Sequence, residues 1–230
     1  MVQERETAGN LNCHDKNDGS VMKKLIRGIV DFRKNVRPSC KDTFAQLALG
    51  QRPDTLFIAC SDSRVVPNLF ASSDPGDLFV IRNVGNIIPP CGAHGHSGSD
   101  ESEAAAIEFA LLTLPVTEII VCGHSECGAM ESLARGRSQV EAPNLKSWLR
   151  HADSCLQTLD SGSPIGRNLE RHNQLSQINV LEQTEHLKTY PVVRKRLEEG
   201  TLRLHGWWFD IKEADVYEYE PDKGHFHLID

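Results

Sequence analysis

The segment at residues 60–64 (CSDSR) combines a side chain that binds soft metal ions with two side chains of opposite charge. Cys60 offers a thiolate, Asp62 a carboxylate and Arg64 a guanidinium, at alternate positions. If the strand that precedes them continues in extended form, the three side chains point to the same side. One pocket would then hold a metal ligand beside a charged pair.

A second segment, residues 124–127 (HSEC), carries another pair of metal-binding side chains. His124 and Cys127 stand three positions apart, and a tight turn or a first helical turn brings both side chains to one ion. Glu126 lies between them and is expected to face solvent, because it would add a hard carboxylate to a donor set that is already filled.

Together, Cys60, His124 and Cys127 match the two-thiolate, one-imidazole set of catalytic zinc sites, which leave a fourth position for water. His124 follows Cys60 by 64 residues, which excludes a compact zinc finger, whose paired ligands lie closer in sequence. Two other interpretations stay open on residue types alone: a reactive thiol beside a histidine, or residues that are simply buried.

Apolar runs that alternate with helical patterns predict the framework that positions these residues. Buried strands are expected at 55–59, 78–81 and 119–122, followed by a late strand at 202–209 and a hairpin partner at 216–219. Helices are expected at 102–114, 126–135, 144–159 and 169–188, and His225 and His227 are assigned to a C-terminal tail. This order predicts an α/β fold with a mainly parallel β-sheet flanked by helices and a late antiparallel edge strand. Both chemical segments directly follow a strand, and active sites of such folds lie beyond the carboxyl ends of the strands.

The N-terminal part of the chain is expected to form an extension rather than part of the sheet. Residues 1–20 are polar and predict a flexible tail. An amphipathic helix is expected at 21–36, ended by Pro38, and a second short helix is expected to stop at Gly50. We therefore expect a single α/β zinc-enzyme domain at residues 21–230, of which 21–50 form an N-terminal helical arm.

The composition of the 230 residues narrows the class of protein further. A formal net charge of −7 leaves no basic face for nucleic acid or for an anionic membrane. No apolar run approaches the roughly 20 residues that span a bilayer. Seven cysteines, an odd number in a chain of this length, disfavour a secreted disulfide scaffold and favour a reducing compartment. We expect a cytoplasmic protein, with a microcompartment or an organelle left open.

The chain resembles the β-class carbonic anhydrases in three motifs that occur in order: 60–64 (CSDSR), 79–90 (FVIRNVGNIIPP) and 123–130 (GHSECGAM). Residues 179–191 (NVLEQTEHLKTYP) and 204–211 (LHGWWFDI) agree with the plant and cyanobacterial branch, and the resemblance covers residues 21–219. It implies a homodimer, or a higher multiple of dimers, that binds one Zn²⁺ per subunit. It also implies reversible hydration of CO2 to bicarbonate and a proton by zinc-bound hydroxide.

The resemblance also assigns roles to individual positions. Cys60, His124 and Cys127 match the zinc ligands, and Asp62 with Arg64 matches the catalytic pair. The pocket for CO2 and bicarbonate is assigned to four further residues: Gln51, Phe79, Val84 and Phe109, the last in place of a tyrosine that often lines the partner subunit's site.

The fourth zinc position has two candidate occupants, water and Asp62. We expect Arg64 to hold Asp62 away from the metal, although Asp62 could become the fourth ligand in a closed state. Some family members close the site through a regulatory bicarbonate bound by a tryptophan and a tyrosine, where this chain has Phe57 and Phe209. A phenyl ring has no group that hydrogen-bonds an anion. We therefore expect no such switch and an open position near neutral pH.

Two alternative functions stay open at this point. A hydrolase acting on carbonyl sulfide or carbon disulfide could use the same site with a different pocket. A non-catalytic zinc or redox protein is the alternative from another class. The Asp62–Arg64 pair argues against this second alternative, because a structural metal site has no use for such a pair.

Overall fold

The computed structural model describes residues 21–92, 95–98 and 101–230. The flexible tail expected at residues 1–20 lies outside these ranges. The chain divides into two compact units, the first ending at Leu49 and the second spanning Gly50–Asp230. All the candidate metal ligands belong to the second unit.

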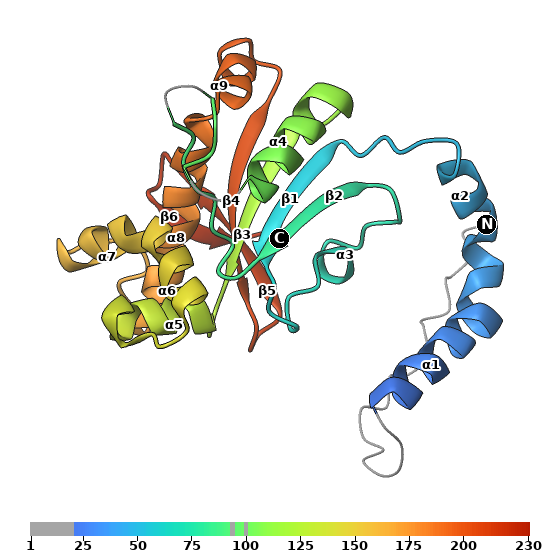
Figure 1. Cartoon of the computed structure of the whole chain (residues 1–230), viewed down its shortest axis with the longest axis horizontal. Coiled ribbons are helices and arrows are strands. Elements are labelled where there is room, and N and C mark those ends of the chain that lie inside the picture. Colours follow the sequence, from blue (N-terminus) through green and yellow to red (C-terminus); the bar gives the residue numbers. More distant parts are fainter. Residues whose placement is uncertain (1–20, 93–94, 99–100) are drawn as a thin grey trace. The chain divides into compact units, whose positions relative to one another are not determined.

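A six-stranded sheet forms the centre of the second unit, with strands in the order β2-β1-β3-β4-β5-β6 (Figure 1). The strands are β1 (Thr55–Cys60), β2 (Leu78–Asn83), β3 (Glu118–His124), β4 (Arg203–Asp210), β5 (Asp215–Glu220) and β6 (His225–Leu228). The first four run parallel to one another, and β5 and β6 add antiparallel pairs. The predicted mainly parallel sheet with a late antiparallel edge is therefore confirmed.

The edge strand differs from the prediction, since it is β6 rather than the segment that contains Val216. His225 and His227, which were assigned to a tail, lie in this strand and pair with β5. Phe226 packs its ring on Tyr219 with 5.4 Å between the ring centroids. This contact, together with main-chain pairing, orders a segment whose sequence pattern is too short to predict a strand.

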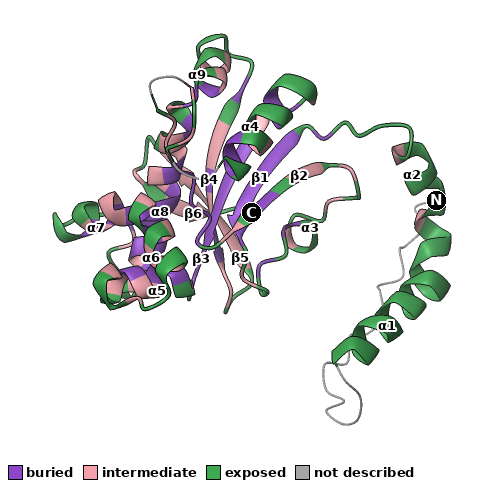
Figure 2. Cartoon of the chain, viewed as in Figure 1, coloured by how far each residue is buried: buried purple, intermediate pink, exposed green. Residues whose placement is uncertain are grey.

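The two faces of β1 pack against different parts of the second unit. Every residue of β1 is buried, as the purple ribbon in Figure 2 shows. Leu56 and Ile58 belong to a cluster with side chains of α4, α8 and α9, whereas Phe57 and Ala59 pack with Phe70 of α3. Burial on both faces explains the unbroken apolar run, because alternate side chains of a strand point to opposite faces.

Helices connect the strands and cover the sheet. They are α3 (Pro67–Phe70), α4 (Ser102–Thr113), α5 (Gly128–Arg135), α6 (Pro143–Leu149), α7 (Asp153–Asp160), α8 (Arg171–Lys188) and α9 (Pro191–Glu198). The continuous helix predicted at 144–159 is wrong, because a 3₁₀ turn at Arg150–Ala152 separates α6 from α7. The tighter turn places Leu149, Ala152 and Cys155 in one buried cluster.

The first unit contains α1 (Val21–Asp31), a π-helical turn at Phe32–Val36 and α2 (Arg37–Leu47). The prediction that Pro38 ends the first helix is wrong, because Pro38 lies in the first turn of α2. A proline in a helix lacks an N–H and clashes with the carbonyl four residues earlier. The wider turn before it, in which the Arg37 N–H bonds to Phe32 O, accommodates the ring.

The helix α1 exposes its apolar side chains, with Val21 79%, Leu25 55% and Ile29 66% accessible. Within the described residues, no helix is both long and apolar enough to cross a membrane. An exposed apolar stripe on a helix of this length is typical of a surface that meets another protein chain.

Candidate metal centre

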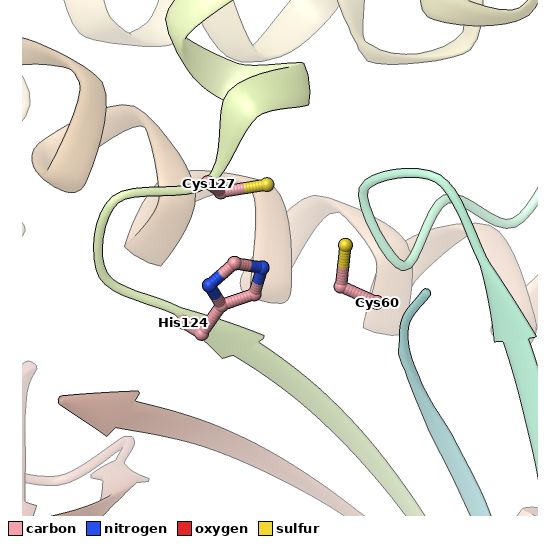
Figure 3. A group of neighbouring side chains, drawn as sticks. All are labelled: Cys60, His124 and Cys127. Carbon is pink, nitrogen blue, oxygen red and sulfur yellow. The ribbon is translucent and has the colours of Figure 1, made fainter. Parts of the chain in front are cut away.

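Cys60, His124 and Cys127 come together at the carboxyl edge of the parallel sheet. Cys60 ends β1, His124 ends β3, and Cys127 precedes the first residue of α5. Their side chains point toward one another (Figure 3), and their ligand atoms all lie within 4.8 Å of each other. All three residues are buried. Within the part of the chain that the structure describes, this is the one group of three or more such side chains close enough to hold an ion.

The ring of His124 is oriented by its own loop. Its Nδ1 atom lies 2.8 Å from the carbonyl oxygen of Ser125, which can only accept a hydrogen bond. Nδ1 therefore carries the proton, and Nε2 of the neutral ring keeps a free lone pair. Nε2 is buried and has no hydrogen-bond partner among the described residues. A buried lone pair without a partner beside two sulfur atoms is what a metal-binding histidine presents before it binds its ion.

The thiols of Cys60 and Cys127 shift each other's pKa in opposite directions. The Cys127 thiol donates to the Cys60 sulfur, and this bond lowers the pKa of Cys60 well below the ordinary thiol value. Burial opposes this effect, and the hydrogen bond from the backbone N–H of Gly85 lowers the pKa of Cys60 further. The same thiol–thiolate bond, together with burial, raises the pKa of Cys127. A divalent cation bound by both sulfur atoms would require both cysteines to be thiolates, and its binding would release their protons.

This donor set fits zinc. Two thiolates and a neutral imidazole are soft or borderline ligands, and three protein ligands match a catalytic rather than a structural zinc site. Among the described residues the cluster contains no carboxylate. The alternative interpretation as simply buried residues does not explain the orphan Nε2 atom of His124.

Asp62 and Arg64 form a bidentate ion pair next to this cluster. Arg64 Nε donates to Asp62 Oδ1 at 2.9 Å and Nη2 to Oδ2 at 2.8 Å, and the Arg64 N–H also donates to Oδ1 at 2.9 Å. The hydrogen bond from Arg64 holds the pKa of Asp62 well below its usual range, against the effect of burial. Asp62 is therefore a carboxylate at any pH near neutrality.

The backbone brings these two side chains together in a different way from the expected one. β1 ends at Cys60, although the Ser61 N–H still donates to Asn83 O of β2 at 2.8 Å. A turn follows, closed by a hydrogen bond from the Val65 N–H to Asp62 O at 3.1 Å. The turn folds Arg64 back onto Asp62, so proximity comes from a turn and not from strand alternation.

Glu126 is anchored on several sides, although its side chain remains 57% exposed. Its carboxylate accepts a hydrogen bond from Asn173 Nδ2 at 2.9 Å and lies 3.1 Å from His172 Nε2. Its N–H donates to Asn173 Oδ1 at 2.7 Å, and its carbonyl accepts from Arg64 Nη2 at 2.9 Å. The expectation that Glu126 faces solvent and is not part of the donor set is therefore confirmed, and its hydrogen bonds are an addition that the sequence did not predict. These bonds hold a non-glycine residue at a φ of 55°, in the left-handed region.

The residues assigned to the substrate pocket lie at three places in the chain. Phe79 on β2 and Phe109 on α4 contact each other with 5.8 Å between the ring centroids, and Phe109 is 43% exposed. Val84 is 44% exposed, and its carbonyl accepts a hydrogen bond from Trp148 Nε1 at 2.7 Å. Gln51 is exposed in the segment that leads into β1.

Phe57 and Phe209 lie in a packed cluster with Phe70 on one face of the sheet. Phe209 stacks on Phe70 with 4.8 Å between centroids, and Phe57 meets Trp207 edge to face at 5.9 Å. Phe57 is 0% exposed and Phe209 is 7% exposed. Neither side chain offers a polar group at this position.

Several residues that support the centre were not identified from the sequence. Arg82 clamps the backbone after β1, donating to Cys60 O from Nε at 3.0 Å and from Nη2 at 2.8 Å, and to Asp62 O at 2.6 Å. Ser176 on α8 donates to His124 O at 2.8 Å. The signal that could have revealed them is a set of polar residues at helical spacing on α8 that the structure buries: Asn173, Ser176, Asn179 and Gln183.

Comparisons with known proteins agree with this arrangement. A family model described as carbonic anhydrase matches residues 55–216. A carbonic anhydrase of Synechocystis sp. is 46% identical over 202 residues, which cover 86% of this chain and 71% of the relative. The solved structure of the β-carbonic anhydrase CcaA matches with a TM-score of 0.84 at 42% identity, covering 91% of this chain and 100% of that one. A tetrameric β-carbonic anhydrase of Sordaria macrospora matches with a TM-score of 0.72 at 30% identity, covering 86% and 95%. The chain therefore belongs to the β-carbonic anhydrase family.

Proposed function

We propose that the chain catalyses the reversible hydration of CO2 to bicarbonate and a proton, with one zinc ion per subunit bound by Cys60, His124 and Cys127. The observation that carries this proposal is the position of a buried soft three-donor cluster directly beside an ion-paired carboxylate. A zinc ion held there supplies a Lewis acid that makes a water molecule nucleophilic near neutral pH.

The Asp62–Arg64 pair keeps an ionised carboxylate beside the metal site, where it can accept a hydrogen bond, and prevents that carboxylate from binding the metal. Both carboxylate oxygens of Asp62 accept hydrogen bonds from Arg64. This bidentate pair favours contact of Asp62 with the guanidinium over contact with the metal. A remaining lone pair of Asp62 accepts a hydrogen bond from the attacking water and orients that water toward the carbon of CO2. Asp62 as a fourth metal ligand belongs to a closed state that requires this pair to separate.

Pocket residues contribute contact and orientation in this proposal. Gln51 donates an amide N–H to an oxygen of CO2 or bicarbonate. Phe79, Val84 and Phe109 provide apolar surface for a substrate without charge. The contact between Phe79 and Phe109 and the partial exposure of Phe109 and Val84 support this assignment.

A homodimer, or a multiple of dimers, is the proposed assembly, with residues 21–50 as a helical arm of a single-domain enzyme. The exposed apolar stripe of α1 supports it, because such a surface is costly to leave in water. The family relationship to a protein described as tetrameric also supports it. The described cysteines are all free thiols, which supports a reducing compartment such as the cytoplasm.

Stopped-flow measurement of CO2 hydration, with metal content determined on the same sample, tests the proposal. We expect turnover that rises in proportion to bound zinc and disappears after chelation. Loss of zinc without loss of activity would overturn it. The values of kcat/KM for CO2 and for carbonyl sulfide separate the two substrate classes, and the names of the relatives favour CO2.

A further inference from the structure

Residues 179–191, which match the family, begin near the middle of α8 and end at the first residue of α9, and they have no role in the chemistry described so far. Two of these residues, Asn179 and Gln183, are 0% exposed although their side chains are polar. Burying an amide is unfavourable unless its hydrogen bonds are made. The partners of these amides therefore indicate what the segment does.

The partners of Asn179 fix the direction of its amide. Its Oδ1 atom accepts from Gln183 Nε2 at 3.0 Å and lies 3.7 Å from the Cys155 thiol. With donors on the oxygen side, the Nδ2 group points the other way and donates to Gly85 O at 3.0 Å. This bond joins α8 to the loop that follows β2.

The same loop carries a donor for a metal ligand. The N–H of Gly85 points at Cys60 Sγ, with 3.3 Å between nitrogen and sulfur. Gly85 adopts a φ of +82°, and a Cβ added there would lie 3.0 Å from Ala129 Cβ of α5. The peptide therefore needs glycine, both for its backbone conformation and for its close approach to α5.

The far end of the loop is tied to α8 as well. The Ile88 N–H donates to Gln183 Oε1 at 2.8 Å, and His186 Nδ1 lies 2.7 Å from Ile88 O. Asn83 closes the loop from within, donating to Ile87 O and accepting from the Ile87 N–H, each at 2.8 Å. A loop held at this many points presents the Gly85 N–H in one direction.

We propose that Asn179 is a positioning residue of the metal centre, which holds Gly85 by its carbonyl group and thereby fixes the direction in which the N–H of the same residue donates to the Cys60 thiolate. The proposal rests on the proposed role of Cys60 as a metal ligand. Two thiolates cancel the formal charge of a divalent cation, and a hydrogen bond to one sulfur withdraws electron density from it. The bond thus limits the loss of Lewis acidity that a two-thiolate site would otherwise suffer.

The test compares three variants by zinc affinity and by the absorption of the cobalt(II)-substituted protein. Asn179→Ala removes the donor to Gly85 O, and Asn179→Ser keeps a hydroxyl too short to reach it. Cys155→Ala is the matched control, because it disturbs the same buried amide and leaves the bond to Gly85 intact. Zinc affinity is measured by competition with a chromophoric chelator.

We expect both Asn179 variants to bind zinc about 10-fold more weakly. Their sulfur-to-cobalt charge-transfer band should move to longer wavelength, because a thiolate without its N–H donor gives up charge more easily. Cys155→Ala should keep the wild-type band and affinity. Should Asn179→Ala fail to fold, Asn179→Ser carries the test.

The proposal is overturned if Asn179→Ser folds with the wild-type band and affinity, or if Cys155→Ala shows the same shift. The proposed ligand set is tested independently by the spectrum of the wild-type protein. The absence of any sulfur-to-cobalt band there would exclude Cys60 and Cys127 as ligands. A positioning defect and a wrong metal assignment are thereby distinguished.

Discussion

Arg64 and Glu126 are joined by a hydrogen bond between side chain and backbone that spans 62 positions of the sequence, with 2.9 Å between Nη2 and the carbonyl oxygen. The same nitrogen also donates to Asp62. One guanidinium therefore connects the carboxylate after β1 to the loop that carries His124 and Cys127. The proposed catalytic pair and the metal loop form one hydrogen-bonded unit.

Replacing Arg64 should separate metal binding from turnover. We expect Arg64→Ala to retain zinc and to lose about 100-fold or more in kcat, because Asp62 is no longer held for the attacking water. The kcat of Arg64→Lys should lie between those of the wild-type protein and Arg64→Ala, since an ammonium group cannot make the bidentate contact. Stopped-flow CO2 hydration with metal analysis measures both properties.

The matched control for this experiment is Arg137→Ala, which removes another bidentate pair, between Arg137 and Asp153. That variant should keep wild-type kcat. A near-normal kcat in Arg64→Ala would contradict the role given to the Asp62–Arg64 pair.

Metal removal should change which cysteines react with iodoacetamide. In the zinc-loaded protein Cys60 and Cys127 are protected, and chelation should make Cys60 the more reactive of the two, because its pKa is lowered by the Cys127 thiol. Cys122 and Cys155 should stay unmodified in both forms, since burial raises the pKa of each thiol. Peptide mapping by mass spectrometry gives the extent of labelling. Equal labelling of Cys60 with and without zinc would argue against it as a ligand.

His151 should make the folded state less stable in mild acid. Burial lowers the pKa of His151 below its ordinary value, and the nearby charge of Arg150 lowers it further. Above the ordinary pKa, His151 is neutral in both the folded and the unfolded protein, so its titration does not change the free energy of unfolding. Below the ordinary pKa, His151 binds a proton more readily in the unfolded chain than in the folded protein. The free energy of unfolding therefore decreases as the pH decreases.

The variant His151→Leu removes this titration. Urea unfolding of both proteins between about pH 7.5 and 5.5 should show wild-type stability falling relative to the variant as the pH decreases. A difference in unfolding free energy that stays constant over this range would show that His151 titrates normally.

The apolar stripe of α1 should be required for dimer formation. Placing carboxylates in it with the double change Leu25→Asp and Ile29→Asp should convert the proposed dimer to monomers, because burying unpaired charges at an interface is strongly unfavourable. Lys23→Asp, on the same helix, is the control for an added carboxylate and should remain dimeric. Sedimentation equilibrium measures the mass. A dimeric double variant would place the interface elsewhere.

Much of the framework was predictable from local patterns. The apolar runs that became β1 and β3 are buried in the centre of a parallel sheet, and such runs are readable because burial of both faces leaves no polar alternation. The candidate ligands were equally readable, since thiol and imidazole chemistry is a property of residue type. Strand endings place these residues at one edge of the sheet without knowledge of any side-chain contact.

Other features were beyond local patterns. The helix continues through Pro38 because a π-helical turn makes room for the ring, and β6 forms because β5 offers a partner strand. Neither outcome follows from propensity, which describes each segment in isolation. The break between α6 and α7 likewise depends on which side chains the buried cluster accepts.

The sequence by itself determined the chemical inventory: a soft donor set, a carboxylate with its guanidinium, and the strand ends that carry them. Only the tertiary structure decided how these groups are held. The turn that returns Arg64 to Asp62, the anchoring of Glu126 by Asn173 and the bond from Asn179 to Gly85 all join segments through directional hydrogen bonds. Such bonds depend on positions and angles set by the packed fold, and residue order alone does not contain them.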